Sequence, residues 1–142
     1  MTAPFVALDL EIPSDIQQIE RVVSQVSAMC RALRIPVRQC SLNIPVALSE
    51  ALANAILRGN HEDRSKSVRL RTLVTDAELV FEVWDEGAGF NLRTSTNNPV
   101  EGVNIEREDG RGLFLMQRLM DRVEQFRDHG NVVRLTLNRS AP

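Results

Sequence analysis

The stretch VALSEALANAILRGN, residues 46–60, sets the first expectation for the fold. Its apolar residues recur at the spacing of an amphipathic helix, and Pro45 just before it is tolerated in a first helical turn. Gly59 and Asn60 are typical of a helix end. We therefore predict a helix that starts between Ser41 and Pro45 and ends at Gly59-Asn60.

Hydrophobic periodicity predicts the other elements of the fold. Ser14 and Gln17 fit a capping box, with Ser14 as N-cap of a long helix that ends before Pro36. Residues 91–109 hold only scattered apolar residues and are predicted to form a long loop, a length typical of functional lids. The remaining expected elements are strands 5–12, 68–75, 79–85, 122–126 and 132–137, and a third helix after Gly112.

Strands clustered as hairpins, with helices between them, are typical of an α+β sandwich. We predict a mainly antiparallel, mixed sheet with helices on one face, in one domain spanning residues 1–142. Phe81 and Trp84 should lie on opposite faces of their strand. A doubly wound dinucleotide fold fits poorly, because the triplets starting at Gly87 and Gly110 do not continue as G-x-G-x-x-G.

Composition excludes several classes of protein. The 142 residues are 43% hydrophobic and 25% charged, which suits one soluble domain with a core. A net charge of −2 disfavours nucleic-acid and anionic-lipid partners. The one lysine, Lys66, follows Ser65 rather than a glycine, which excludes a lysine-dependent P-loop. Cys30 and Cys40 are too few for a zinc site, and no apolar run approaches membrane-spanning length, so we expect a cytoplasmic protein.

Glu50 and Asn54 stand four residues apart in the predicted helix of residues 46–60. Their side chains should therefore project from nearly the same face. Carboxylate and amide oxygens are ligands that Mg²⁺ prefers, and one protein ligand can suffice when water completes the shell. The alternative is a pair of ordinary polar residues on the solvent side of a helix.

Asp85 lies at the end of a predicted strand and is followed by Gly87 and Gly89. A carboxylate there can accept a hydrogen bond from an exocyclic amino group, and glycines let a flat ring approach the backbone. The alternative is a strand-ending turn that holds an acidic residue.

Gly110, Arg111 and Gly112 open the third predicted helix. Backbone N–H groups at a helix start form an anion site suited to phosphate, to which an arginine can add a charge-assisted contact. The alternative is a glycine-rich helix start with no ligand. A metal-binding helix face, a base-reading carboxylate and a phosphate-binding helix start together describe an ATP site without a catalytic lysine.

Three motifs carry a resemblance to a known superfamily. Residues 47–56, followed by Gly59-Asn60, resemble the N box of the GHKL ATPases. Residues 85–90 and 110–116 resemble the first and second glycine boxes of that superfamily. The residues of these motifs are most similar to those of the anti-sigma-factor serine/threonine kinases, and the resemblance covers nearly the whole chain. It implies the Bergerat-type α/β sandwich.

The resemblance also implies roles for matching residues. Asn54 would be the Mg²⁺ ligand, Glu50 the acidic residue that polarises the attacking hydroxyl or water, and Asp85 the acceptor for the adenine amino group. Residues 91–109 would form the ATP lid. The nucleotide-binding set is completed by Gly87 and Gly89 on the adenine side and by Gly110, Arg111, Gly112 and Leu113 on the phosphate side.

The function implied is that of an ATP- and Mg²⁺-binding anti-sigma regulator. Such a protein sequesters a sigma factor and phosphorylates a Ser or Thr of an anti-anti-sigma (STAS) antagonist, and relatives are commonly homodimers. One alternative keeps the nucleotide site but uses it only to shape a protein-binding surface. Another, a detached histidine-kinase catalytic domain, is disfavoured because the first predicted helix has no histidine to accept phosphate.

Overall fold

The structure is a computed structural model that describes residues 4–87 and 108–139, with only the backbone described for residues 108–111. Short helical turns extend two of its helices: a 3₁₀ turn, Ile16–Gln18, precedes α1, and π-helical turns, Gln39–Asn43 and Ala55–Gly59, flank α2. The main elements are β1 (Phe5–Pro13), α1 (Ile19–Ala32), α2 (Ile44–Asn54), β2 (Ser67–Val74), β3 (Glu78–Asp85), α5 (Glu108–Leu119), β4 (Arg122–Arg127) and β5 (Asn131–Asn138).

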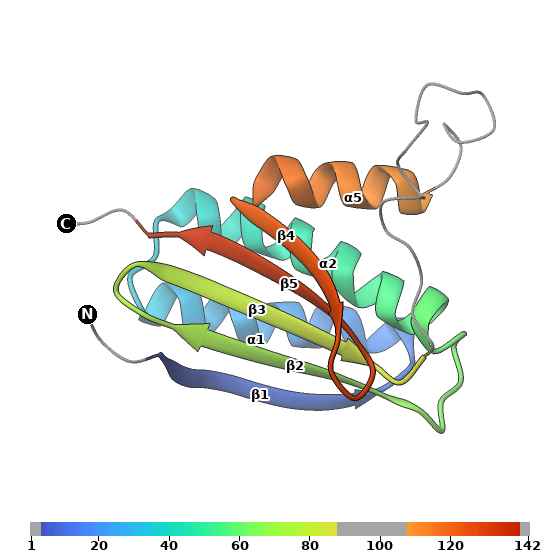
Figure 1. Ribbon diagram of the computed structural model, residues 1–142. Coiled ribbons are helices and arrows are strands. Elements are labelled where there is room, and N and C mark those ends of the chain that lie inside the picture. Colours follow the sequence, from blue (N-terminus) through green and yellow to red (C-terminus); the bar gives the residue numbers. More distant parts are fainter. Residues whose placement is uncertain (1–3, 88–107, 140–142) are drawn as a thin grey trace.

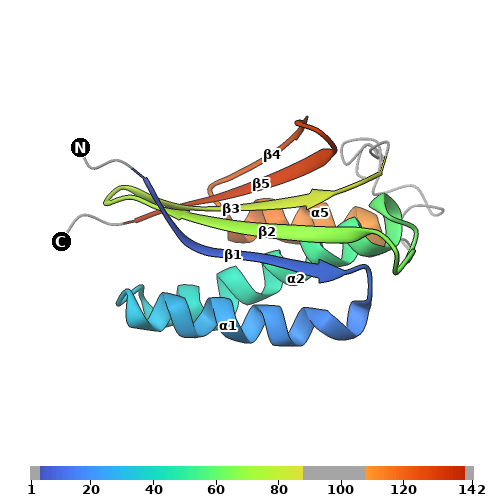
Figure 2. The same cartoon turned by 90° about the horizontal axis from the view of Figure 1, so that it is seen from below.

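The five strands form one sheet in the order β1-β2-β3-β5-β4. All four pairings between these described strands are antiparallel. The three helices α1, α2 and α5 cover one face of the sheet, while its other face carries no described helix (Figures 1 and 2). The predicted α+β class, with helices on one face of the sheet, is confirmed. The predicted mixed character is wrong for the described strands, because every neighbouring pair among them is antiparallel.

Strand register builds the core between the sheet and the helices. Phe81 pairs with Thr72 on one side and with Leu135 on the other, and its side chain is fully buried. Because side chains alternate between the two faces of a strand, the residues aligned across the sheet point to the same side. The helix-facing core of the sheet includes Ile12, Val68, Leu70, Val74, Leu79, Phe81, Val83, Val133, Leu135 and Leu137.

The central helix of the covering layer is α2, which packs between α1 and α5 and contacts β3 and β5. The helical stretch Gln39–Gly59 is long and apolar enough, by length and composition, to cross a membrane. That finding differs from the expectation that no apolar run approaches this length. Half of the apolar part of this stretch is buried inside the protein. Core helices of soluble proteins have the same length and composition, so these two properties are weak evidence for a membrane span.

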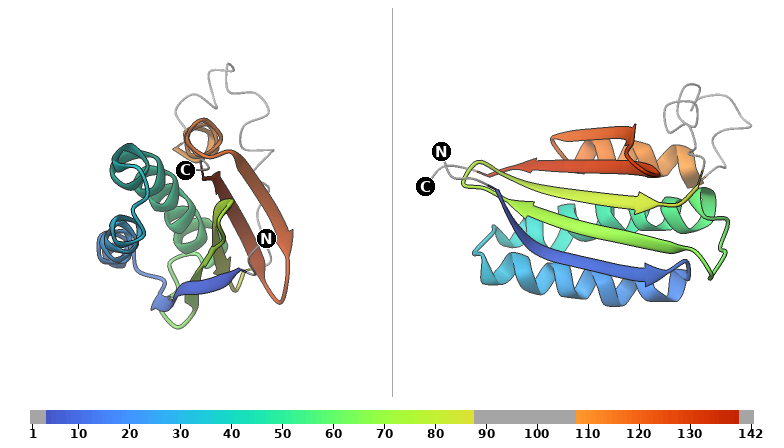
Figure 3. Two further views of the ribbon diagram at one scale, coloured as in Figure 1. Left: turned by 90° about the vertical axis from the view of Figure 1, so that its left-hand side faces the viewer. Right: turned by 60° about the horizontal axis from the view of Figure 1, so that its bottom comes forward.

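The uncovered face of the sheet carries charged side chains around aromatic rings, together with apolar residues such as Leu73 and Val80. Trp84 lies on this face, opposite Phe81 as expected, with the guanidinium carbons of Arg69 and Arg71 at 5.4 and 5.9 Å from its ring centroid. Arg134 pairs with the buried Glu82 at 2.9 Å on the same face. Figure 3, left, shows the helices on one side of the sheet and this face on the other.

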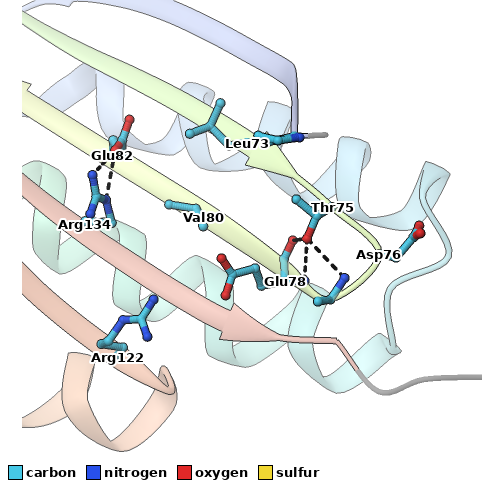
Figure 4. Close-up of a pocket in the computed structure, with 10 residues that line it drawn as sticks. Leu73, Thr75, Asp76, Glu78, Val80, Glu82, Arg122 and Arg134 are labelled. Atoms are coloured by element: carbon cyan, nitrogen blue, oxygen red, sulfur yellow. Dashed lines mark hydrogen bonds and ion pairs between the residues drawn. The ribbon is translucent and has the colours of Figure 1, made fainter. Parts of the chain in front are cut away.

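The turn between β2 and β3 forms without glycine, because a threonine side chain supplies its hydrogen bonds. The Oγ1 atom of Thr75 accepts from the backbone N–H groups of Ala77 at 3.1 Å and Glu78 at 3.0 Å, as Figure 4 shows. Hydroxyl side chains at this position imitate a backbone turn. The hairpin predicted around residues 76–78 is therefore confirmed.

The predicted cap of α1 is wrong by one residue. Asp15, and not Ser14, is the N-cap of the short turn before α1, and its Oδ1 accepts from the N–H of Gln17 at 3.0 Å. Ser14 is buried, and its hydroxyl donates to the carbonyl oxygen of Lys66 at 2.9 Å. Both serine and aspartate serve as N-caps. Asp15 takes this role because the hydroxyl of Ser14 bonds to the distant Lys66 instead.

We predict that Phe81→Ala lowers the free energy of unfolding by about 3–5 kcal/mol, because it removes a fully buried ring from the core. Urea unfolding of the purified protein measures this. The matched control is Phe114→Ala, since the Phe114 side chain is exposed and contacts Arg118 through its ring; it should cost no more than about 1 kcal/mol. Equal losses for the two variants would contradict this account of the core.

Candidate functional site

Asp85 ends β3 and is buried, with 2% of its surface exposed. Its Oδ1 accepts from the N–H of Gly87 at 2.9 Å, and its Oδ2 accepts from Nδ2 of Asn131 at 3.0 Å. Burial raises the pKa of this carboxyl, while these two hydrogen bonds and the charges of Arg127 and His61 oppose the rise. Each carboxylate oxygen has a second lone pair, so the group can still accept from a ligand.

Two glycines allow the backbone to approach Asp85 closely. A Cβ atom on Gly59 would lie 2.3 Å from Cγ of Asp85, and one on Gly87 would lie 2.0 Å from the carbonyl oxygen of Gly59. Real Cβ atoms do not make contacts this short. The π-helical turn that extends α2 can therefore pack against the end of β3 only if both positions are glycine.

The turn between β4 and β5 closes the other side of Asp85. Gly130 has a φ of +144°, and a Cβ there would lie 2.4 Å from the carbonyl oxygen of Asp85. Asn131 follows it, is 2% exposed, and accepts from Nε2 of Gln125 at 3.0 Å while it donates to Asp85. The sequence predicted strands 122–126 and 132–137 on either side of this turn but no role for Asn131, whose local signal is its position after a glycine in the final hairpin.

Glu50 and Asn54 meet the start of α5. A Cβ on Gly112 would lie 2.9 Å from Oε2 of Glu50 and 3.7 Å from Nδ2 of Asn54. The predicted i, i+4 pair on α2 thus points at the backbone of the second predicted glycine motif. Helix periodicity alone predicted that the two side chains share a face, and the packing of α5 on α2 supplies the backbone that they meet.

These residues fit a divalent cation bound together with phosphate. Asn54 is 6% exposed, and its Nδ2 is buried without a hydrogen-bond partner. A buried N–H donor without a partner is costly and suits a site completed by a phosphate oxygen. The carbonyl oxygen of the same amide is the atom that could bind Mg²⁺. No cluster of three or more His, Cys, Asp or Glu side chains occurs among the described side chains of residues 4–87 and 112–139, so a metal there would need water and phosphate oxygens, as Mg²⁺ prefers.

The elements that carry the described site residues come together at one end of the molecule. The end of β3, the end of the helical run through α2 and the start of α5 all lie there, at the right in Figure 1. Gly110 belongs to the first turn of α5, and Leu113 is 3% exposed with its side chain in the core, so its backbone is the part open to a ligand role.

Two predicted features fall outside what the structure describes. They are Gly89 and the side chain of Arg111. The predicted lid, residues 91–109, also lies outside the described part except for its last two residues, which belong to α5.

A separate hollow of about 580 Å³ lies at the far end of the uncovered sheet face, beside the turn between β2 and β3. Leu73 and Val80 form part of its lining, and Arg122 and Arg134 lie across from Glu78 (Figure 4). None of the predicted site residues lines it. We therefore assign it no part in the site at the end of β3.

Cys30 and Cys40 are both free and buried. Burial raises the pKa of the Cys30 thiol to about 12 and also raises that of Cys40. Thiols with raised pKa values stay protonated at neutral pH and are poor nucleophiles and metal ligands. This agrees with the expectation that neither cysteine forms a zinc site.

We predict that Gly59→Ala lowers the free energy of unfolding by about 1–3 kcal/mol, because its methyl group would overlap the buried Asp85 carboxyl. Gly112→Ala is the matched control. Its methyl group would be tight only against the far end of the Glu50 side chain and would make an ordinary contact with Nδ2 of Asn54 at 3.7 Å, and alanine favours the helical state. Urea unfolding should rank Gly59→Ala well below Gly112→Ala; the reverse order would contradict the close approach at Asp85.

We predict that the stability difference between the wild type and Asp85→Asn depends on pH. The folded-state pKa of Asp85 lies above its ordinary value, so between the two values the native state holds more protons than the unfolded state. Wild-type stability from this group is therefore lost as pH rises through the folded pKa, whereas the asparagine of the variant does not titrate.

Urea unfolding of both proteins from about pH 4 to about pH 7 measures this difference, since the other carboxyls cancel. The free energy of unfolding of the wild type, minus that of the variant, should decrease as pH rises. A difference that stays constant across this range would show that burial does not perturb Asp85.

Comparison with known proteins assigns a family. Residues 12–137 match the model of the histidine kinase-like ATPase domain. This range runs from the end of β1 to the end of β5 and contains every predicted site residue.

Curated relatives carry kinase and anti-sigma names. The chain is 33% identical to the serine-protein kinase RsbW of Bacillus licheniformis over 104 residues, which are 68% of this chain and 65% of that protein. It is 32% identical to the anti-sigma F factor of Caldanaerobacter subterraneus over 97 residues, 66% of this chain and 67% of that protein. It thus spans just under two thirds of the length of the RsbW kinases of Bacillus licheniformis and Oceanobacillus iheyensis.

A solved structure shares the fold. The crystal structure of the RsbU and RsbW domains of a Mycobacterium tuberculosis protein matches with a TM-score of 0.64 at 20% sequence identity. The match covers 99% of this chain and 33% of that one. The predicted Bergerat-type sandwich is therefore confirmed.

Proposed function

The chain belongs to the histidine kinase-like ATPase domain family, and from that premise we propose that it is an ATP- and Mg²⁺-dependent serine/threonine kinase of the anti-sigma type. The names of the relatives, serine-protein kinase and anti-sigma F factor, support this proposal. In this role the protein sequesters a sigma factor and is released from it by a STAS-domain antagonist, which it phosphorylates.

The observation that carries the proposal is the buried carboxyl of Asp85 between Gly59 and Gly87. An acceptor held in an apolar setting, next to backbone without side chains, suits a flat base with an exocyclic amino group. Guanine carries a carbonyl at the corresponding position, which cannot donate to a carboxylate. The site should therefore select ATP over GTP.

On the phosphate side, Asn54 would hold Mg²⁺, and the backbone N–H groups of the first turn of α5, that of Gly110 among them, would hold phosphate oxygens. Gly112, one turn further on, would leave space beside Glu50 and Asn54 because it has no side chain. Mg²⁺, when bound, supplies positive charge that offsets the negative charge of the phosphates. Positive partial charge at a helix start adds to this. No lysine lies in either predicted glycine motif. In this proposal the phosphates are therefore held by backbone amides and a cation.

Glu50 would orient and deprotonate the attacking hydroxyl of the antagonist's Ser or Thr. The new bond joins that hydroxyl oxygen to the γ-phosphorus, the bond from the γ-phosphorus to the bridging oxygen of ADP breaks, and the hydroxyl proton passes to the carboxylate. The closeness of the Glu50 carboxylate to the backbone of Gly112 near the start of α5 supports this role.

A sigma factor and a STAS protein are the partners proposed, in the cytoplasm, together with a second copy of the chain as the partner in a homodimer. The predicted absence of a nucleic-acid partner rests on the net charge of −2. The proposed lid, residues 91–109, would cover the nucleotide.

We predict that Asn54→Ala abolishes Mg²⁺-dependent ATP binding, because it removes the proposed metal ligand. Isothermal titration calorimetry of ATP in Mg²⁺ buffer and in EDTA measures this. The wild type should lose affinity in EDTA, and the variant should show the weak affinity in both buffers. An unchanged affinity of the variant in Mg²⁺ buffer would remove Asn54 from the site.

We predict that Glu50→Gln binds ATP with nearly wild-type affinity and loses phosphotransfer by a factor of about 10² or more, as is typical for the loss of a general base. Labelled ATP, incubated with the protein and a panel of STAS proteins, measures transfer. A variant that transfers at the wild-type rate would exclude Glu50 as the base. A wild type that binds ATP and labels none of the panel would favour the alternative of a nucleotide-gated binding module.

A further inference from the structure

Asn60 lies directly after the π-helical turn that extends α2, and its side chain is fully buried with every polar atom partnered. Its Oδ1 accepts from the N–H of Glu86 at 2.8 Å. Its Nδ2 donates to Oγ of Ser14 at 2.8 Å and to the carbonyl oxygen of Ser67 at 2.9 Å. Burying an amide is favourable only when all of its hydrogen bonds are made, as they are at this position.

These bonds join the ends of three strands. Ser14 follows β1, Ser67 begins β2, and Glu86 follows β3. The hydroxyl of Ser14 donates onward to the carbonyl oxygen of Lys66 at 2.9 Å, and the N–H of Ser67 donates to the side chain of Glu86. Asn60 is therefore the centre of a hydrogen-bond network that holds three strand ends to the end of the central helix.

The third of these strand ends carries the proposed adenine site. Glu86 stands between Asp85 and Gly87, so the bond from its N–H to Asn60 fixes the peptide group that follows Asp85. The carboxyl of Asp85 and the bare backbone of Gly87 can meet a flat base only while that peptide keeps its orientation. Displacements of about 1 Å in such positioning groups can cost up to about a hundredfold in enzyme function.

We propose that Asn60 is a positioning residue for adenine selectivity. It holds the Asp85–Gly87 turn in position through its hydrogen bond with the N–H of Glu86. This inference rests on the proposed function, because it takes ATP as the ligand. Asn60 acts through Asp85 and touches no part of the nucleotide.

Two substitutions separate this role from a general contribution to stability. Asn60→Asp keeps an acceptor facing the Glu86 amide, but it lacks the amide nitrogen that donates to Ser14 and Ser67. Asn60→Ala loses all three hydrogen bonds. Both variants should be less stable than the wild type. Only Asn60→Ala loses the hydrogen bond that the Glu86 N–H makes to the side chain at position 60.

The test is isothermal titration calorimetry of the full chain with Mg-ATP and with Mg-GTP, beside urea unfolding of each variant. We expect the ratio of ATP to GTP affinity to fall by about tenfold in Asn60→Ala and to stay within about threefold of the wild type in Asn60→Asp. Val22→Ala is the matched control, because Val22 is a buried core residue of α1. It should lose stability and keep the wild-type ratio.

An Asn60→Ala protein that loses stability but keeps the wild-type ratio, as Val22→Ala does, would overturn the inference. Should Asn60→Ala fail to fold, Asn60→Ser replaces it, since its shorter hydroxyl cannot reach the Glu86 amide; the same loss is expected, and an unchanged ratio overturns the proposal. A wild type that binds no nucleotide, or shows no preference for ATP, instead contradicts the proposed function itself.

Discussion

The buried carboxyl of Asp85 constrains the structure around the candidate site. A carboxylate removed from water is costly unless hydrogen bonds hold it, and its raised pKa shows that burial outweighs the opposing interactions. Gly87 and Asn131 each donate one of those bonds. Because these donors come from a turn after β3 and from the start of β5, the carboxyl ties the loop between β4 and β5 to the middle of the sheet.

The same carboxyl explains why the central helix ends as it does. Gly59 must lack a side chain, since its backbone lies against the Asp85 carboxyl, and Asn60 follows it as the buried centre of the network that joins three strand ends. Along the helical run, Glu50 and Asn54 precede Gly59 by nine and five residues. One helical run, made of α2 and the π-helical turn after it, therefore carries the phosphate-side groups and the glycine beside the proposed base site.

The helices, the strands and the main site residues were predictable, because their sequence signals lie within a few neighbouring residues. The i, i+4 spacing of Glu50 and Asn54 places them on one helix face whatever the helix packs against. Apolar alternation predicted the strands, and their grouping into hairpins predicted an α+β sandwich with helices on one face. The family resemblance of three short motifs then placed Asp85 and Gly112 in one site, and α5 does bring Gly112 against Glu50.

Other features depended on contacts between residues far apart in the chain. Ser14 fits an N-cap by its neighbours, but a partner 52 residues away takes its hydroxyl, and Asp15 caps instead. The local signals at Asn60 and Asn131, a helix end and a hairpin turn, do not reveal their hydrogen-bond partners, because those partners come from distant strand ends. The sequence by itself therefore determined the elements and the chemistry-bearing side chains, while the tertiary structure decided which buried polar groups hold them, since a buried hydrogen bond requires a partner that only packing can bring within reach.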